Sequence, residues 1–184
     1  MTLKGRKVVL GVCGGIAAYK SAYLVRLLQG EECKVQVVMT TNGTRFITPL
    51  SLATLSGRPV YTTMWPSEDA LQQADIAHIE LAEWAEVMVV APATANCLAK
   101  LSCGLADDLL STTLITVTCP VLLCPAMNMN MYNNPIVQEN ISFLKDKGYE
   151  VMEPGAGQLA CKDIGPGRMP EPEEILEEID RLLG

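Results

Sequence analysis

Apolar residues in this chain fall into short continuous runs, and segments with the periodicity of a helix lie between them. The apolar runs span residues 7–12, 34–39, 87–90, 121–123 and 149–152, and they predict strands. Helices are predicted over residues 18–30, 46–55, 77–85, 97–103, 107–116, 136–147 and 171–183. This alternation predicts one domain over residues 1–184, a three-layer α/β/α sandwich with a mostly parallel, Rossmann- or flavodoxin-like sheet.

Glycine and proline predict where several elements begin and end. Gly30 suits the position after the first helix, and Pro49 is expected to break the helix at 46–55. Asn134 is expected to cap the helix that starts at Pro135. Residues 153–169 are rich in Gly and Pro, which predicts a long flexible loop without secondary structure, of the kind that serves as a lid.

Small and polar residues follow the predicted strands. Gly14 and Gly15 follow the first strand, Thr40 the second, residues 94–96 the third, and Asn128 the fourth. In an open α/β sheet, ligands bind at the edge formed by the carboxyl ends of the strands. We therefore expect these groups to surround one ligand site, with the Asn128 amide held among methionines.

The glycine turn after the first strand differs from the two common nucleotide motifs. It lacks the G-x-G-x-x-G fingerprint because Cys13 replaces the second glycine, and no acidic residue ends the second strand to hold a ribose. It also lacks a P-loop, because Tyr19 stands before Lys20 where that motif needs glycine. Two interpretations remain open: a turn that holds a single phosphate at a helix N-terminus, or a plain tight turn.

Composition narrows the class of protein. The chain has 184 residues and a formal net charge of -7, which argues against a nucleic-acid surface. Its seven cysteines are odd in number and no signal-peptide pattern is present, so we expect a reducing, cytoplasmic location. One His and no Cys/His pair at zinc spacing predict no metal site, and no apolar run is long enough for a membrane span.

Two further residues carry possible chemistry. His78 shares a helix face with apolar neighbours, a pattern that favours a core histidine over a catalytic one. Cys161 lies beside Lys162 within the predicted lid, where a thiol is expected to be exposed and its thiolate favoured.

Six sequence motifs occur in order along nearly the whole chain. They are GVCGGIAAYK at 11–20, FITPL at 46–50, HIEL at 78–81, APATAN at 91–96, PAMNMNMY at 125–132, and AC at 160–161 followed by GPGRM at 165–169. Together they resemble the flavin-dependent cysteine decarboxylases. The resemblance implies FMN as cofactor, bound by Gly14, Gly15, Ile16, Thr40, Phe46, Thr94, Ala95, Asn96 and Met127.

The resemblance also implies a reaction. Within the family, the motifs are most similar to those of members that convert 4′-phospho-N-pantothenoylcysteine to 4′-phosphopantetheine in coenzyme A biosynthesis. Oxidation of the thiol to a thioaldehyde lets carbon dioxide leave, and the resulting enethiolate is then reduced. The implied catalytic residues are His78, Asn128 and Cys161, with Cys161 as the proton donor of the last step; Asn128, Ala160 and Arg168 are implied to bind substrate.

Family members form homotrimers with the flavin at the subunit interface, and bifunctional members with a fused synthetase domain form dodecamers. The resemblance thus implies that His78 reaches the site of a neighbouring subunit. This chain departs from the family at Cys13, where a hydroxyl residue is common, at Lys162, where glycine is usual, and at Tyr132, where tryptophan is frequent.

Three alternatives share the fold. A peptidyl-cysteine decarboxylase of antibiotic maturation would use the same chemistry, so substrate assays are needed to separate it. A flavin prenyltransferase is disfavoured by the combination of the Asn128 motif and Cys161. A non-catalytic, phosphatase-regulating member would not need to keep His78, Asn128 and Cys161 together.

Overall fold

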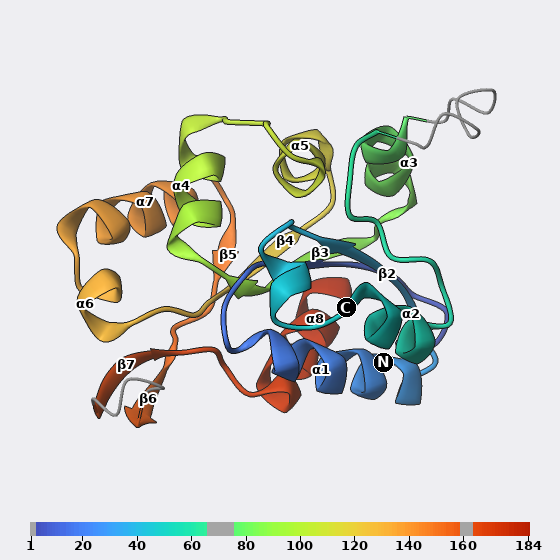
Figure 1. Cartoon of the computed structure of the whole chain (residues 1–184), viewed down its shortest axis with the longest axis horizontal. Coiled ribbons are helices and arrows are strands. Elements are labelled where there is room, and N and C mark those ends of the chain that lie inside the picture. Colours follow the sequence, from blue (N-terminus) through green and yellow to red (C-terminus); the bar gives the residue numbers. More distant parts are fainter. Residues whose placement is uncertain (1–2, 66–75, 159–163) are drawn as a thin grey trace.

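The computed structural model describes residues 3–65, 76–158 and 164–184. Five parallel strands form one sheet in the order β2-β1-β3-β4-β5 (Figure 1). They are β1 (Lys7–Val12), β2 (Lys34–Met39), β3 (Val87–Ala93), β4 (Val121–Pro125) and β5 (Glu150–Val151). This is the flavodoxin-like strand order, whose connections reverse direction between β1 and β3, so the predicted fold class is confirmed.

Helices cover both faces of the sheet. α1 (Ala18–Gly30), α2 (Pro49–Ser56) and α8 (Pro172–Leu183) pack on one face, and α3 (Ala77–Trp84), α4 (Ala95–Cys103), α5 (Leu109–Thr116) and α7 (Pro135–Asp146) on the other (Figure 1). None of the helices in the described ranges has the length and apolar character needed to cross a bilayer.

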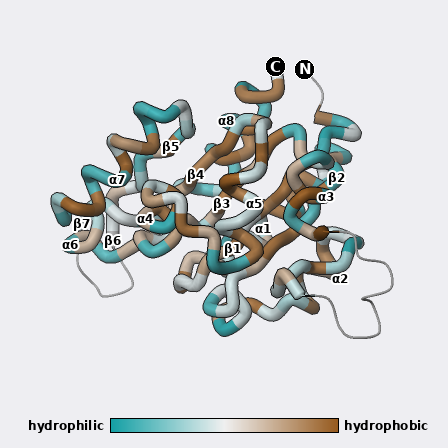
Figure 2. Tube along the Cα trace, turned by 90° about the horizontal axis from the view of Figure 1, so that it is seen from above, coloured by the Kyte–Doolittle hydropathy of each residue, from teal (hydrophilic) through white to brown (hydrophobic). Residues whose placement is uncertain are grey.

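The core lies between the sheet and these two helix layers. Val8 and Leu10 of β1 pack toward α1 and α8, whereas Val9 packs toward the opposite layer. All seven residues of β3 are buried, which confirms that this strand is central. Figure 2 shows the central strands as a hydrophobic centre surrounded by more hydrophilic helix surfaces. The carboxyl edge of the sheet is therefore held by packing on both sides.

Two predicted helix boundaries were wrong. Gly30 is the last residue of α1, and the left-handed backbone falls instead on Glu32, with φ 58°. Pro49 begins α2 rather than breaking a helix, because the Thr48 side chain caps the helix and proline lacks only an N–H that the first turn leaves unpaired. The Asn134 cap and Pro135 start of α7 are confirmed.

The prediction that residues 153–169 lack secondary structure was also wrong in the described part. β6 (Gly155–Gln158) and β7 (Ile164–Arg168) form an antiparallel pair. Glycine and proline hid the strand pattern, because these residues supply no alternation of apolar and polar side chains. A short helix, α6 (Met129–Tyr132), lies next to this hairpin (Figure 1). Residues 159–163 lie outside the described residues.

Candidate functional site

A cavity of about 1140 Å³ opens at the carboxyl ends of the central strands. Its size is that of a large small-molecule site. Ten residues predicted for cofactor or substrate lie in its wall: Gly14, Gly15, Ile16, Thr40, Thr94, Ala95, Asn96, Met127, Asn128 and Arg168. The structure therefore brings together strand ends that are far apart in the sequence, as the parallel sheet requires.

The turn between β1 and α1 presents backbone donors to this cavity. Within the described residues, the N–H groups of Gly14, Gly15, Ile16 and Ala17 have no protein acceptor. The N-cap residue of α1, Ala17, supplies no side-chain cap, and the first turn carries no acidic residue. Unpaired N–H groups at a helix N-terminus attract an anion, so the geometry favours the phosphate site over a plain tight turn.

Gly14 allows this turn to pack closely against the loop after β2. A Cβ at this position would overlap the side chain and backbone of Asn42. The same loop is held by Thr40, whose hydroxyl accepts a hydrogen bond from the Gly43 N–H at 3.0 Å. Glycine is thus required at Gly14 by contact, not by a left-handed backbone.

The end of β3 leads directly into α4. Thr94 caps this helix, its hydroxyl accepting a hydrogen bond from the Cys97 N–H at 3.3 Å. Ala95 and Asn96 form the first turn and line the cavity. The small side chain at Ala95 leaves the backbone accessible to a ligand.

Asn128 sits between β4 and α6. Its side-chain oxygen accepts a hydrogen bond from the Asn130 N–H at 2.8 Å, which caps α6 and fixes the side chain on the cavity wall. The preceding N–H, of Met127, donates to the Gly167 carbonyl at 2.9 Å. The hairpin strand β7 is therefore attached to the Asn128 loop.

Replacing Gly167 by alanine is expected to lower the free energy of unfolding by about 1–3 kcal/mol. Gly167 has φ 129°, and a Cβ there would overlap the Met127 carbonyl oxygen. Urea unfolding followed by circular dichroism measures the change. Gly155→Ala is the matched control in the same hairpin, because its Cβ would meet its nearest atom at an ordinary 3.8 Å. Equal losses in both variants would contradict the prediction.

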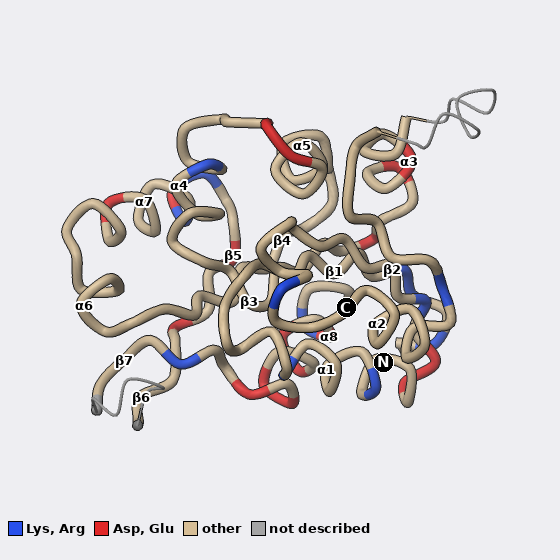
Figure 3. The backbone as a smooth tube through the Cα atoms, in the orientation of Figure 1, with Lys and Arg blue, Asp and Glu red and all other residues tan. Residues whose placement is uncertain are grey.

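Two ionic groups lie at the cavity wall. Lys100 pairs with Asp107 and, at 2.7 Å, with Asp108. Burial opposes the charge of Lys100, but the hydrogen bonds to the two carboxylates outweigh it and raise the lysine pKa. A second group joins Lys20, Arg168 and Glu171. Elsewhere the charges are dispersed: Figure 3 shows Lys and Arg scattered among Asp and Glu.

Cys13 and Cys97 are buried beside each other at the back of the cavity. A side-chain hydrogen bond from Cys97 lowers the pKa of Cys13, although burial opposes this. The same bond, together with burial, raises the pKa of Cys97. The Cys13 thiol thus has a protein partner, Cys97, within the cavity wall.

Not all predicted residues meet in this cavity. Phe46 is half-exposed and His78 is partly buried on α3, and neither belongs to the wall. Ala160 and Cys161 lie outside the described residues, so their predicted roles stay predictions. Among the described residues, no group of His, Cys, Asp and Glu side chains is arranged to hold a metal ion.

Sequence reasoning missed several wall residues. Lys20, Lys100 and Asp108 line the cavity. Lys20 was considered only as part of a P-loop motif that the sequence lacks. Asp108, inside the helix predicted over residues 107–116, is the N-cap of α5 and forms a complete capping box. A signal was available for Lys20, because a lysine in the first turn after a glycine turn is placed to face the same ligand.

Comparison with known proteins agrees with this arrangement. The Flavoprotein family model matches residues 1–184. The coenzyme A biosynthesis bifunctional protein CoaBC of Vibrio vulnificus is 47% identical over 175 residues, which is 95% of this chain and 43% of that protein. The chain therefore spans less than half the length of this relative.

Two solved structures are similar over almost the whole chain. A PPC decarboxylase cysteine-to-serine variant complexed with pantothenoylaminoethenethiol has a TM-score of 0.86 and 32% identity, covering 97% of this chain and 98% of that one. The FMN-dependent cysteine decarboxylase SpaF has a TM-score of 0.82 and 30% identity, covering 98% of this chain and 97% of that one. The sequence and the fold agree, and the chain belongs to the Flavoprotein family.

Proposed function

We propose that this chain binds FMN and decarboxylates 4′-phospho-N-pantothenoylcysteine to 4′-phosphopantetheine, in coenzyme A biosynthesis. The observation that carries the proposal is one cavity with the free N–H groups of residues 14–17 at one wall and the Asn128 amide at another. The names of the similar proteins support it: CoaBC acts in coenzyme A biosynthesis, PPC decarboxylase holds an enethiol, and SpaF is FMN-dependent.

The residues present fit a flavin phosphate. The free N–H groups of the β1–α1 turn and the positive end of α1 offer an anion site, while Thr40 and Thr94 supply hydroxyls near it. Small residues at the β3–α4 junction leave room for a flat ring. When bound there, FMN supplies the two-electron oxidation of the substrate thiol and the later return of those electrons.

The chain's own residues then orient substrate and move protons. Asn128, fixed by its cap of α6, is placed to hydrogen-bond the substrate carboxylate or amide. Arg168 supplies a positive charge for an anionic group of the substrate. Cys161 is the proposed donor of the final proton to carbon. His78 is proposed to assist deprotonation or to hold the reacting carboxylate.

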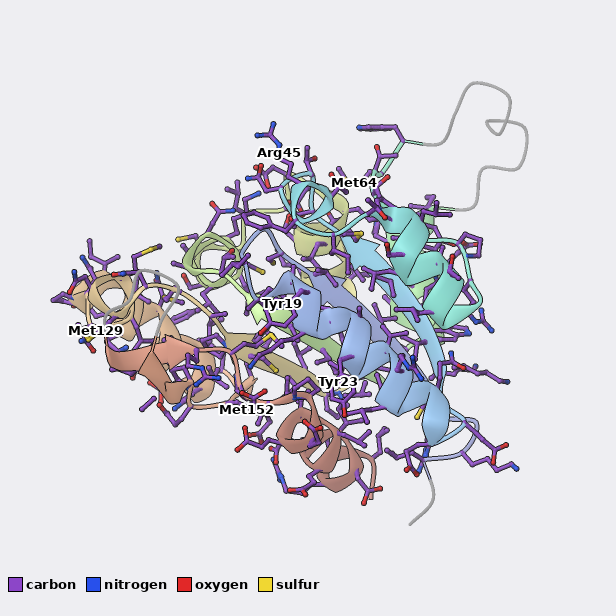
Figure 4. The ribbon with its side chains drawn as sticks, turned by 60° about the horizontal axis from the view of Figure 1, so that its bottom comes forward. Tyr19, Tyr23, Arg45, Met64, Met129 and Met152 are labelled. Atoms are coloured by element: carbon purple, nitrogen blue, oxygen red, sulfur yellow. The ribbon has the colours of Figure 1, made fainter. Side chains whose placement is uncertain are left out.

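An exposed apolar face beside the cavity supports the proposed homotrimer. Tyr19 and Tyr23 lie on one side of α1 with exposed fractions of 63% and 48%, and they follow one another in Figure 4. Ile16, in the turn just before α1, is 62% exposed. Two further large apolar side chains, Phe46 and Leu50, are 50% and 75% exposed just before and at the start of α2. Large exposed apolar patches mark interaction sites. A subunit seated here would cover Phe46 and bring residues such as His78 to the flavin.

The wider context is part of the same proposal. The CoaBC relative is more than twice the length of the match, which supports a synthetase domain in a longer protein. A dodecamer is the assembly proposed for that longer form. A cytoplasmic location fits the free cysteines of the described residues.

Incubation with 4′-phospho-N-pantothenoylcysteine tests the function. We expect a yellow protein that releases carbon dioxide and forms 4′-phosphopantetheine, measured by mass spectrometry. A peptide ending in cysteine is the second substrate, and preference for it would favour the peptidyl-cysteine decarboxylase alternative. A protein that retains FMN and processes neither substrate would favour the non-catalytic, regulatory alternative.

Replacing Gly14 by alanine is expected to weaken FMN binding at least tenfold, a cost of about 1.4 kcal/mol or more. The added Cβ has to displace the Asn42 backbone, which moves the N–H groups of the turn. Titration of the apoprotein with FMN, followed by flavin fluorescence, gives the dissociation constant. Gly30→Ala, where a Cβ meets nothing within 4 Å, is the control. Unchanged affinity in Gly14→Ala would show that the turn does not hold the phosphate.

A further inference from the structure

One carboxylate on the cavity side of the molecule serves two cations. Glu171 Oε1 accepts from Lys20 Nζ at 2.8 Å and from Arg168 Nη2 at 3.2 Å. Lys20 comes from the first turn of α1, Arg168 from the end of β7, and Glu171 from the N-cap of α8. Lys20 and Arg168 both line the cavity. The wall here therefore carries two positive charges against one negative charge.

Lys20 anchors the carboxylate to the rigid part of the fold. Its side chain is only 11% exposed, and Nζ also donates to the Met169 carbonyl at 3.4 Å. Glu171 is half-exposed, but its pairing with a nearly buried lysine limits where its side chain can lie. The position of the carboxylate is thus set by α1, the same helix whose N-terminus faces the cavity.

Arg168 depends on this carboxylate for its direction. Its side chain runs along Gly157 of β6, where a Cβ would come within 2.8 Å of Nη1. Among the described residues, Glu171 is the one side chain that pairs with the guanidinium. Because Gly157 has no side chain, the Arg168 side chain can lie against the backbone of β6. Glu171 then holds the guanidinium end of that side chain.

We infer that Glu171 is a positioning residue for substrate binding. It holds the Arg168 guanidinium where an anionic group of the substrate, its carboxylate or its phosphate, enters the cavity. Lys20 keeps the carboxylate in place and leaves the cluster with one net positive charge to attract that anion. This inference rests on the proposed function, because it assigns Arg168 to substrate rather than to flavin.

Glu171→Gln tests the inference because it keeps the size of the side chain and removes its charge. We expect KM for 4′-phospho-N-pantothenoylcysteine to rise about tenfold, with kcat within about twofold and the bound FMN unchanged, the pattern of a lost binding interaction. Glu174→Gln is the matched control: Glu174 forms the other half of the α8 capping box, accepting from the Glu171 N–H at 2.8 Å. Its KM should stay at the wild-type value.

A double variant separates positioning from a structural role. If Glu171 acts through Arg168, then Arg168→Gln and Arg168→Gln/Glu171→Gln should share the same raised KM. Additive increases would overturn the inference, because Glu171 would then act independently of the arginine. An unchanged KM in Glu171→Gln alone would overturn it as well.

The substrate group that meets Arg168 can be identified in the same assay. N-pantothenoylcysteine lacks the phosphate. With this substrate, Glu171→Gln and the wild type should have equal KM values if Arg168 binds the phosphate, whereas the KM of Glu171→Gln should stay about tenfold higher if Arg168 binds the carboxylate. Either result supports the inference, provided that Glu171→Gln raises KM for 4′-phospho-N-pantothenoylcysteine. A wild-type protein that binds FMN but leaves the full substrate unchanged would overturn the proposed function, and this inference with it.

Discussion

Replacement of Cys161 by serine is expected to stop the proposed reaction after carbon dioxide has left. A serine hydroxyl is a far weaker acid than a thiol, so the final proton transfer to carbon should slow by about 10²–10⁴-fold, the usual contribution of a positioned acid. Carbon dioxide release needs no proton from this residue and should continue for one turnover. The expected product is the enethiol instead of the saturated thiol, with FMN still bound.

A related solved structure supports this expectation. A PPC decarboxylase with a cysteine changed to serine was found complexed with pantothenoylaminoethenethiol, an enethiol of the expected kind. Cys161 is the cysteine that its Lys162 neighbour and its motif single out in this chain. Mass spectrometry separates the two products by two mass units, since the enethiol carries two hydrogen atoms fewer.

Cys103→Ser is the matched control for this experiment. Cys103 is an exposed free cysteine at the end of α4, and it does not line the cavity. Its variant should form the saturated product at the wild-type rate. If Cys161→Ser forms the saturated product equally fast, another group donates the proton, and Cys161 has no role in the last step.

The fold could be predicted from the sequence because each strand and helix has a pattern of apolar residues that can be recognised within its own segment. Strands buried on both faces, such as β3, need continuous apolar runs, and helices packed on one face need periodic ones. The β6–β7 hairpin could not be predicted in this way. Gly167 packs closely against Met127 and Gly165 against Met129, and those contacts come from an earlier part of the chain, outside the hairpin.

The site was predictable to the extent that position in the sheet determines it. Any residue just after a parallel strand reaches the same edge, so Thr40, Thr94 and Asn128 could be expected there without knowledge of their contacts, and all three line the cavity. The pairing of Lys20 could not be predicted, because its partner Glu171 is 151 residues away. Phe46 and His78 remain predictions, because neither lies in the wall of this cavity.

Replacement of His78 by asparagine is expected to abolish decarboxylation while FMN remains bound. Asparagine retains hydrogen-bonding capacity at a similar size but cannot exchange a proton near neutral pH, so turnover should fall by about 10²–10⁴-fold. His78 is partly buried on α3 and is absent from the cavity wall of its own chain, which leaves it free to serve a neighbour's site in the proposed trimer. Turnover at the wild-type rate would return His78 to the interpretation of a core residue.

Mixed subunits decide where His78 acts. Suppose that each site takes His78 from one chain and Asn128 from the next. Then co-expressing His78→Asn and Asn128→Ala chains in equal amounts should restore about a quarter of the sites. An intact site needs an Asn128→Ala chain to supply His78 and a His78→Asn chain to supply Asn128, and each is present at its place in about half of the cases. Each variant alone should stay inactive. Two inactive variants that give no activity together would place both residues in the same chain's site, and the exposed face of α1 would then need a different explanation.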